Sequence, residues 1–528
     1  MTDSFLLYGY PWLLIAVLAA WAALIWTNFK TIRSLFSPLI TPRGWAAAAL
    51  IFLAALCLRL VVFPPRHQVY FDEFAHQDAA ENISRSHTFG ETLAGGLDVP
   101  PLLQPPASPG GFHVLLGTLF KLTGPSETAA FRFNAVLASL SVLVLFLLAA
   151  LLFNDQLTGL ACALLLAGLP LHIRFSGTAD LSPCSTLWVL IALLALALYQ
   201  KAEKLPMYLL LLASLAYSVN VRFENLVLVL CAAFVLARLW RRSGSVRQDG
   251  YLITSCAFAG PLIPAVALAL RNRGHGLYGY ADPWPGLFHN LVRNLPSNLA
   301  YLLSSWAYVL VLAPAIAIGW LKAEKTVRPW MTELLALGLG YLVVCSAHAG
   351  GDFNDSATER LALPTVLALI LAAGGGFKVI MSRARSRASG AAWISGAFVM
   401  CSLPYYGKLP REHYEAEYRL VADSAASLPQ DAYVLAYCPP LIRVGARKPA
   451  ASPVLALLGG EGFLDDLDGK GARPLILFKD VWWYKYADAS GKLERMLRSR
   501  YRSEPLKTAN IDGDEYGFHL LTRRQTIP

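Results

Sequence analysis

Long apolar runs recur along most of the chain, and they constrain its fold more than any other feature. Of the 528 residues, 56% are hydrophobic and only 15% are charged, and the mean hydropathy is +0.47. Soluble proteins carry about 25% charged residues, whereas a helix of about 20 apolar residues crosses the hydrocarbon core of a bilayer. The sequence therefore predicts an all-α polytopic membrane protein.

Twelve apolar runs are long enough, or nearly so, to span a bilayer. They cover approximately residues 5–26, 44–63, 131–153, 157–171, 184–200, 206–220, 223–239, 251–270, 298–321, 331–347, 361–380 and 391–404. A shorter run near 112–122 follows a Pro-rich segment, and we expect it at the membrane surface. Only Asp3, and no Lys or Arg, precedes the first run, so we interpret it as a retained helix rather than a signal peptide.

The charges of the loops predict the orientation of the chain. Alternate loops are short and rich in Lys and Arg, which is typical of the cytoplasmic side. Their cations are Lys30, Arg33, Arg43, Lys201, Lys204, Arg241, Arg242, Arg247, Lys322, Lys325, Arg328, Lys378, Arg383, Arg385 and Arg387. The segments 64–130, 172–183, 271–297 and 348–360 are then expected outside, with everything after 404. This distribution explains the net charge of +10 without a nucleic-acid partner.

The chain after residue 404 has the composition of a small α/β domain. Runs at 434–438, 474–478 and 516–521 are typical of strands, and the charged segment 492–502 is typical of a helix. We find no catalytic motif in this tail. The expected organisation is an extra N-terminal helix and loop (1–43), a membrane domain with external loops (44–404) and an external domain (405–528).

An acidic segment follows the second apolar run on the side expected to be external. It reads VYFDEFAHQDAAENISR from Val69 to Arg85. Asp72 is able to cap a helix, and acids in a first turn are favoured by the helix dipole. Asp72 and His76 are spaced i, i+4, which suits either a metal pair or an ordinary surface pair. Asp78 and Glu81 are expected on a solvated helix face.

The other external loops add a second carboxylate and several arginines. These residues are Arg174, Asp180, Arg271, Arg273 and Arg360. Guanidinium groups match the oxygens of a phosphate, and carboxylates beside them suit a general base or a divalent metal. The pattern predicts a site for an anionic lipid headgroup at one membrane face.

The order of the motifs resembles the GT-C superfamily of polyprenyl-phosphate-sugar glycosyltransferases over most of residues 44–400. An Asp-Glu pair comes first, then Pro105-Pro106 before a short helix, and then FRF at 131–133. LPLHIRFSGTAD at 169–180 and RLALP at 360–364 follow. The closest likeness is to the branch with the protein O-mannosyltransferases and the lipid A aminoarabinose transferase, glycosyltransferase family 39.

This resemblance implies a role for each matching residue. Asp72 would be the catalytic base at the acceptor hydroxyl, with Glu73 beside it and Asp180 in the same site. Arg174 and Arg360 would bind the donor phosphate, and Arg271 and Arg273 are further candidates for that role. The sugar would leave a polyprenyl phosphate by a single displacement with inversion.

Several alternatives remain open from the sequence. A divalent metal ion held by Asp72, Asp180 and His76 is one option, and no other cofactor is expected. Arg222 and Glu224 flank a short turn, where they either pair with each other or contact substrate. A transporter or flippase for lipid-linked or anionic solutes is the main rival function, and a non-catalytic assembly partner is another.

The nearly charge-free spans favour an enzyme at the membrane surface over a transport path. Its expected partners are the lipid-linked sugar, an acceptor glycan, lipid or protein, and the bilayer. The expected location is the inner membrane, with the catalytic loops and the tail in the periplasm.

Overall fold

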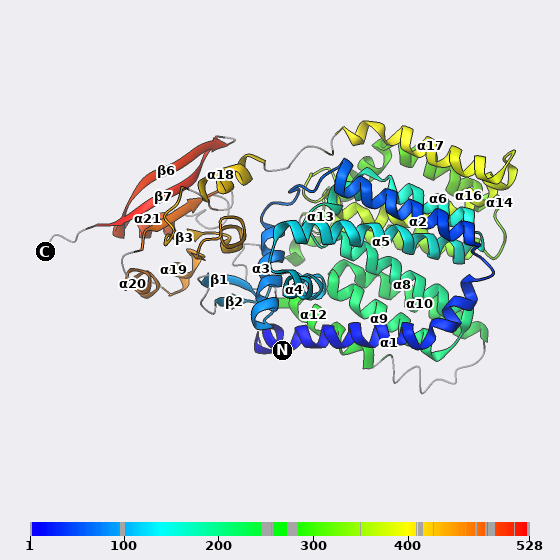
Figure 1. The fold of residues 1–528 in the computed structure, drawn as a ribbon, viewed down its shortest axis with the longest axis horizontal. Coiled ribbons are helices and arrows are strands. Elements are labelled where there is room, and N and C mark those ends of the chain that lie inside the picture. The colour runs from blue at the N-terminus through cyan, green and yellow to red at the C-terminus, as the bar shows by residue number, and fades with distance from the viewer. Residues whose placement is uncertain are drawn as a thin grey trace.

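The computed structural model has a long helical body, with a smaller domain built around a β-sheet at one end (Figure 1). Helix α3 (Tyr70–Ser86) lies between the two parts. The structure describes residues 3–95, 101–243, 255, 257–271, 283–348, 350–407, 409, 415–425, 427–459, 461–469, 473–480, 483, 491–511 and 513–524.

The body is built from helices that follow the predicted apolar runs. Their bounds are η1 Phe5–Gly9, α1 Tyr10–Phe36, α2 Pro42–Cys57, η2 Leu58–Val62, α5 Glu127–Phe153, α6 Gln156–Ala167, α7 Pro170–Ser176, α8 Ser182–Ala202, α9 Leu205–Val221, η3 Phe223–Asn225, α10 Leu226–Ser243, α12 Leu262–Arg271, α13 Pro283–Ser304, η4 Tyr308–Leu312, α14 Ala313–Lys322, α15 Arg328–Ala347, η5 Glu359–Ala362, α16 Leu363–Arg383 and α17 Arg387–Tyr406.

Within the described residues, six helices are long and apolar enough to cross a membrane. They are Phe5–Phe36, Pro42–Val62, Glu127–Phe153, Ser182–Ala202, Arg328–Ala347 and Glu359–Arg383. Two helix pairs, α6 with α7 and α13 with η4 and α14, are bent by 59° and 74° and raise the number to eight if each is one span. A membrane protein is thus supported, but the expected twelve spans are not confirmed as a number.

The expected spans that fail the test of length and composition fail for local reasons. The run 206–220 forms α9, which has only 17 residues. The run 251–270 is described in part, and its final residues form the 10-residue α12. Short helices of this kind need tilting or thinning of the bilayer to span it.

The helices begin where the sequence supplies caps and pack closely where it supplies glycine. Ser126 and Asp155 accept hydrogen bonds from the first turns of α5 and α6, which satisfies amide groups that a helix leaves free. Helices α14 and α16 meet at Gly376, where a Cβ atom would collide with the carbonyl oxygen of Ala315. Small residues permit such close approach between membrane helices.

The segment 64–130, which the loop charges predict to be external, contributes two helices and two short strands. We refer to this segment as the first external loop because of that prediction. Helix α3 is followed by β1 (Glu91–Gly95), β2 (Leu102–Gln104) and α4 (Gly111–Thr123). The short run predicted near 112–122 is therefore a helix. It packs against α3, and a Cβ atom at Gly117 would lie 2.9 Å from the carbonyl oxygen of Ala80.

The C-terminal domain confirms the three strands and the helix predicted in the tail. The strands are β3 (Tyr433–Ala436), β5 (Leu475–Lys479) and β7 (Asp514–Arg523), and the helix is α21 (Lys492–Arg500). β3 and β5 are parallel neighbours, and their apolar runs suit strands that are covered on both faces. The remaining elements are α18 Glu415–Ala425, η6 Leu441–Gly445, β4 Ala450–Ala451, α19 Val454–Gly459, α20 Glu461–Gly469 and β6 Tyr501–Ile511.

The sheet is not made by the tail alone. Its seven strands run in the order β2-β1-β4-β3-β5-β7-β6, so the first external loop supplies one edge. Ala94 of β1 pairs with Ala451 of β4 in antiparallel register. The tail expected as a separate domain from residue 405 onwards therefore shares its sheet with residues that precede α4.

Candidate active site

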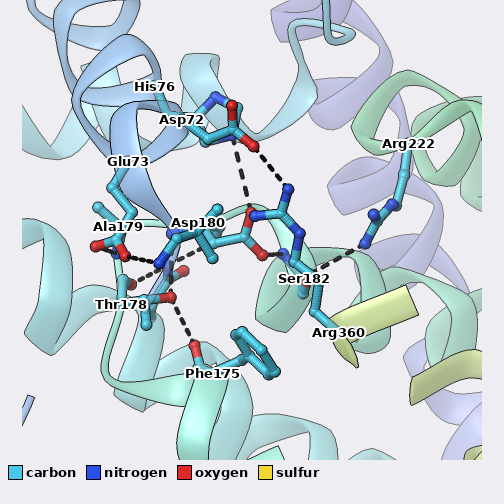
Figure 2. Close-up of polar contacts among 12 residues, drawn as sticks. Asp72, Glu73, His76, Phe175, Thr178, Ala179, Asp180, Ser182, Arg222 and Arg360 are labelled. Atoms are coloured by element: carbon cyan, nitrogen blue, oxygen red, sulfur yellow. Dashed lines mark hydrogen bonds and ion pairs between the residues drawn. The ribbon is translucent and has the colours of Figure 1, made fainter. Parts of the chain in front are cut away.

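Arg360 joins two of the predicted carboxylates. It lies in η5, directly before α16, and its Nη2 donates to Asp72 Oδ2 at 2.6 Å. Its Nη1 donates to Asp180 Oδ1 at 2.8 Å. Figure 2 shows the guanidinium group between the two carboxylates. Three residues from three separate loops thus meet through charge-assisted hydrogen bonds, which are stronger than neutral ones.

Asp180 is fixed by the loop between α7 and α8. Its side chain is 1% exposed, and Oδ2 accepts a hydrogen bond from the backbone of Ser182 at 2.9 Å. The buried Asn134 of α5 donates to the carbonyl oxygens of Thr178 and Asp180 at 2.6 and 2.7 Å. The backbone around Asp180 is therefore held from the neighbouring helix.

The charge state of Asp180 follows from competing effects. Burial raises the pKa of this carboxyl, but the charges of Arg360 and Arg222 outweigh burial and lower the pKa to about 2. Asp180 is therefore an ionised group at neutral pH, and it balances the charge of Arg360 in a place with little water.

Asp72 differs from its acidic neighbours in exposure. It lies in the first turn of α3, and its side chain is 33% exposed, compared with 0% for Glu73 and 1% for Asp180. Among the three expected catalytic carboxylates, Asp72 is the most exposed to solvent.

Glu73 uses its oxygens to hold the backbone. Oε1 accepts hydrogen bonds from the amides of Gln68 and Val69, both at 2.7 Å. Oε2 accepts from the amide of Ala179 at 3.3 Å and contacts His67 Nδ1 at 3.1 Å. Glu73 thus connects the start of α3 to the loop that carries Asp180.

His67 is a buried cation beside this connection. Its Nδ1 faces Glu73, and its Nε2 lies 3.3 Å from Glu127 Oε2. Burial lowers the pKa of His67, but the two glutamates outweigh burial and raise the pKa to about 10. The ring stacks on Tyr418 of the C-terminal domain, with 4.1 Å between centroids.

Arg174 lines a cavity together with Glu359 of η5. Its Nη1 donates to Glu359 Oε2 at 2.5 Å and its Nε to Gln68 Oε1 at 2.8 Å. The hydroxyl of Tyr301 donates to Glu359 Oε1 at 2.7 Å. The cavity has about 40 Å³ of room for water-sized spheres, and it is lined by Leu169, Pro170, Leu171, Arg174, Tyr301, Ser305, Tyr308, Glu359, Ser402, Tyr405 and Leu409.

The residues considered for a metal ion do not form a metal site here. His76 Nε2 lies 3.9 Å from Asp180 Oδ1, and His76 Nδ1 is 3.0 Å from His113 Nε2. Arg360 occupies the space between Asp72 and Asp180, as Figure 2 shows. In the described ranges, no group of three His, Cys, Asp or Glu side chains is arranged to hold a metal. We therefore derive no step through a metal ion.

The remaining predicted residues divide into described and undescribed positions. Arg222 pairs with Glu224 at 3.2 Å, which is one of the two alternatives left open by the sequence, and also donates to the hydroxyl of Ser182 at 3.0 Å. Arg273 lies outside the described residues, and only the backbone of Arg271 is described, at the end of α12.

The prediction that Asp78 and Glu81 are solvated is wrong. Their residues are 0% and 3% exposed, although both lie on α3 in the first external loop. Asp78 forms an ion pair with Arg443, and Glu81 with Arg447 at 3.1 Å. The C-terminal domain covers this face of the helix, which the local sequence pattern does not reveal.

Three residues of the site were missed from sequence. Glu359, Tyr301 and His67 each contact a predicted site residue or its partner. Glu359 had a signal, since it directly precedes Arg360 in the loop. Tyr301 had none, because its partner Glu359 lies 58 positions away. His67 lies six positions before Glu73, and this short spacing was a signal that the motif analysis did not use.

Comparison with known proteins gives partial matches in sequence. Residues 107–266 match the family model described as dolichyl-phosphate-mannose-protein mannosyltransferase. The chain is 31% identical over 193 residues to the undecaprenyl phosphate-alpha-4-amino-4-deoxy-L-arabinose arabinosyl transferase of Pseudomonas aeruginosa. With the protein of that name from Pseudomonas paraeruginosa it is 48% identical over 63 residues, which is 12% of each chain. The longer match covers 35% of this chain and only about a third (34%) of the relative.

Comparison of structures gives a match over nearly the whole chain. The crystal structure of ArnT from Cupriavidus metallidurans, bound to undecaprenyl phosphate, superposes with a TM-score of 0.57 at 14% sequence identity. The match covers 91% of this chain and 98% of that one. At this level of identity the likeness establishes a shared fold.

Proposed function

We propose that this chain, which shares the GT-C fold of the polyprenyl-phosphate sugar transferases, is itself a membrane glycosyltransferase. It would move a sugar from a polyprenyl-phosphate donor to an acceptor hydroxyl at the external face of the membrane, with inversion at the sugar. The names of its relatives describe undecaprenyl phosphate and dolichyl phosphate sugar donors, and they support this class of donor.

One observation carries the proposal. Arg360 binds the exposed Asp72 and the buried Asp180 at once. An arginine held by one fixed, ionised carboxylate keeps its position, so it is able to hold the second carboxylate in a defined place. This arrangement presents a base and a cation side by side, as a transfer from a phosphate leaving group requires.

The chemistry is a single displacement. The acceptor oxygen forms a bond with the anomeric carbon while the bond from that carbon to the phosphate oxygen breaks. Asp72 takes the proton of the acceptor hydroxyl, and the polyprenyl phosphate leaves with the bonding electrons. Preorganised cations stabilise the charge that develops on the phosphate in such a transition state, and Arg360 and Arg174 are the candidates here.

The cavity beside Arg174 suits the donor. Its wall combines leucines and tyrosines with one Arg–Glu pair, and a lipid phosphate needs both apolar contact and a cation. A phosphate that approaches Arg174 has to compete with Glu359, its present partner. We therefore propose that donor binding breaks the pair between Arg174 and Glu359.

The test uses the full chain in lipid nanodiscs. Purified protein is incubated with polyprenyl-phosphate sugars and an extract of envelope glycans and lipids, and released polyprenyl phosphate is measured. Asp72→Asn is expected to lower the rate roughly 10²- to 10⁴-fold, because the acceptor proton loses its base. Asp355→Asn is the matched control, since Asp355 is an exposed carboxylate of the loop before η5, and it should leave the rate unchanged.

Two outcomes would contradict the proposal in different ways. Transfer at the normal rate by Asp72→Asn would refute the assignment of the base but not the reaction. If donor is never consumed in nanodiscs, and a labelled lipid crosses the bilayer of sealed vesicles that contain the chain, the chain is a flippase.

A further inference from the structure

The face of α3 that points away from the helical body carries acids that are buried. Asp78 and Glu81 lie on this face, two turns beyond Asp72, and Asn82 follows. Carboxylates are rarely buried unless they are paired. Glu81 has one partner on α3 itself, Arg85, at 2.7 Å. The partners outside α3 are therefore the ones that bear on where the helix lies.

Arg443 of η6 is the partner of Asp78. The guanidinium group is 3% exposed and donates from Nη1 to both Asp78 Oδ1 and Thr92 Oγ1. Asp78 Oδ2 also accepts from the amide of Thr92 at 2.7 Å, and Asn82 donates to the carbonyl oxygen of Gly90 at 2.8 Å. One buried network thus connects α3, β1 and the C-terminal domain.

The dependence of this network on Arg443 is strong. Burial raises the pKa of Asp78 even though Arg443 and Thr92 act to lower it. Removing one partner of a buried ion pair leaves an uncompensated charge, which costs much more than removing both. Arg443 is therefore the charged group that offsets part of the cost of burying this carboxyl.

Further contacts extend the same interface along the helix. Arg447 pairs with Glu81 one turn after Asp78. At the other end, Phe74 packs near Gly445 and lies 5.8 Å from the ring of Tyr418, centroid to centroid. The C-terminal domain therefore contacts α3 from Phe74 to Glu81.

A helix of this length behaves as a rigid rod. Asp72 and Asp78 are six residues apart, which is about 9 Å along the axis at 1.5 Å per residue. A displacement at Asp78 therefore moves Asp72 relative to Arg360, which belongs to a different loop. Misplacement of a reacting group by about 1 Å is enough to lower a rate roughly 100-fold.

We propose that the C-terminal domain is a fixed part of the active site, in which Arg443 is a positioning residue that holds α3 and keeps Asp72 against Arg360. The inference rests on the proposed transferase function only for its kinetic consequence. The position of α3 is a property of the fold and is measured without substrate.

The experiment compares Arg443→Met with Arg443→Lys in the full chain. Arg502→Met is the matched control, because Arg502 is 77% exposed on β6 and pairs with Glu504 on the same strand. Hydrogen–deuterium exchange of α3 reports on its position and order, and steady-state kinetics report on transfer. Arg443→Met should speed exchange in α3 and lower kcat roughly 10- to 100-fold, with the donor KM within about twofold. Arg443→Lys should restore part of both, and Arg502→Met should change neither.

The outcomes separate this inference from the proposed function. If the wild-type chain transfers no sugar, the proposed function fails and the exchange of α3 still decides the inference. Unchanged exchange in α3, with a higher acceptor KM and a normal kcat, would overturn the inference and make the domain an acceptor-binding module. If Arg443→Met does not accumulate, the double variant Asp78→Asn with Arg443→Met removes both charges, and it should change exchange and kcat in the same directions by smaller amounts.

Discussion

The two ends of α3 carry the same kind of residue and meet opposite surroundings. At its start, Asp72 and Glu73 face the helical body, and Asp72 stays partly exposed beside Arg360. Further along, Asp78 and Glu81 face the C-terminal domain and are both buried against arginines. A partly exposed carboxylate is able to act on a substrate, whereas a carboxylate that is buried against its partner stabilises the fold.

The contrast extends to the arginines. Arg360 binds two carboxylates and lies where a substrate would approach Asp72, while Arg443 binds Asp78 and Thr92 inside an interface. We therefore assign Arg360 a role in the proposed reaction and Arg443 a role in positioning α3. Three further changes are ways to break or sharpen this distinction.

The largest effect is expected from Arg360→Met. This change leaves Asp72 without its cation and Asp180 buried with one partner fewer, so both the placement of the base and the stabilisation of phosphate charge are lost. We expect kcat to fall roughly 10²- to 10³-fold, the range for losing one preorganised electrostatic group. Single-turnover transfer assays measure it.

The matched control for that change is Arg383→Met, at the other end of α16 and exposed. It should retain nearly full activity. Equal losses in both variants would mean that Arg360 acts on the stability of α16 rather than on the reaction.

A smaller effect is expected from Asn298→Ala on α13. Asn298 is fully buried, donates to Ser346 Oγ and to the carbonyl oxygen of Gly351, and accepts from the amide of Phe353. It thereby fixes the loop that leads to Arg360. Leaving such buried groups without a partner should lower the free energy of unfolding by roughly 2–3 kcal/mol. Fluorescence thermal scans should show this loss as a lower melting temperature.

Asn290→Ala removes the same side chain from the same helix, where it makes one long hydrogen bond of 3.4 Å to Ala347. It should change stability by only a few tenths of a kcal/mol. If the two variants melt alike, the loop before η5 does not depend on the buried asparagine.

The smallest effect is expected from a change at His67, which contacts Glu73 at the start of α3 and Tyr418 of the C-terminal domain. Its pKa is raised to about 10 in the folded chain from an ordinary value of 6.5. The stabilisation from its charge is therefore complete below pH 6.5 and is lost as the pH rises through about 10. His67→Gln should lower the free energy of unfolding by about 1 kcal/mol at pH 6 and by less at pH 10.

Melting curves of both proteins between pH 6 and pH 10.5 measure this difference. A gap between wild type and His67→Gln that stays constant over the whole range would contradict a charged His67. Comparing the gap, rather than either curve alone, removes the contribution of lysines and tyrosines that titrate in the same range.

Much of the fold could be predicted because local patterns of apolar residues determine its helices and strands. The apolar runs predicted the helices, and three short β-branched and aromatic runs predicted β3, β5 and β7. The count of spans was less secure, because the break between α6 and α7 and the short α9 depend on packing rather than on composition. The sharing of β1 with the tail has no local signature at all.

The site was predictable to the extent that motifs at one membrane face had to converge. Asp72, Asp180 and Arg360 do meet, as the external loops suggested. The sequence does not show which acid is left exposed, because exposure depends on residues hundreds of positions away. Asp78 appeared solvated for that reason, since its partner Arg443 lies 365 positions further along the chain.

The pairing of β1 with β4 also sets an order of events during synthesis. Their paired residues, Ala94 and Ala451, are more than 350 positions apart. At 5–20 residues per second a ribosome needs roughly 20–70 s to cover that distance. During that time α3 lacks the segment whose arginines pair with Asp78 and Glu81. The proposed positioning of Asp72 would therefore be completed only near the end of translation. A chain released before η6 would carry Asp72, Asp180 and Arg360 but would lack the domain that we propose holds α3.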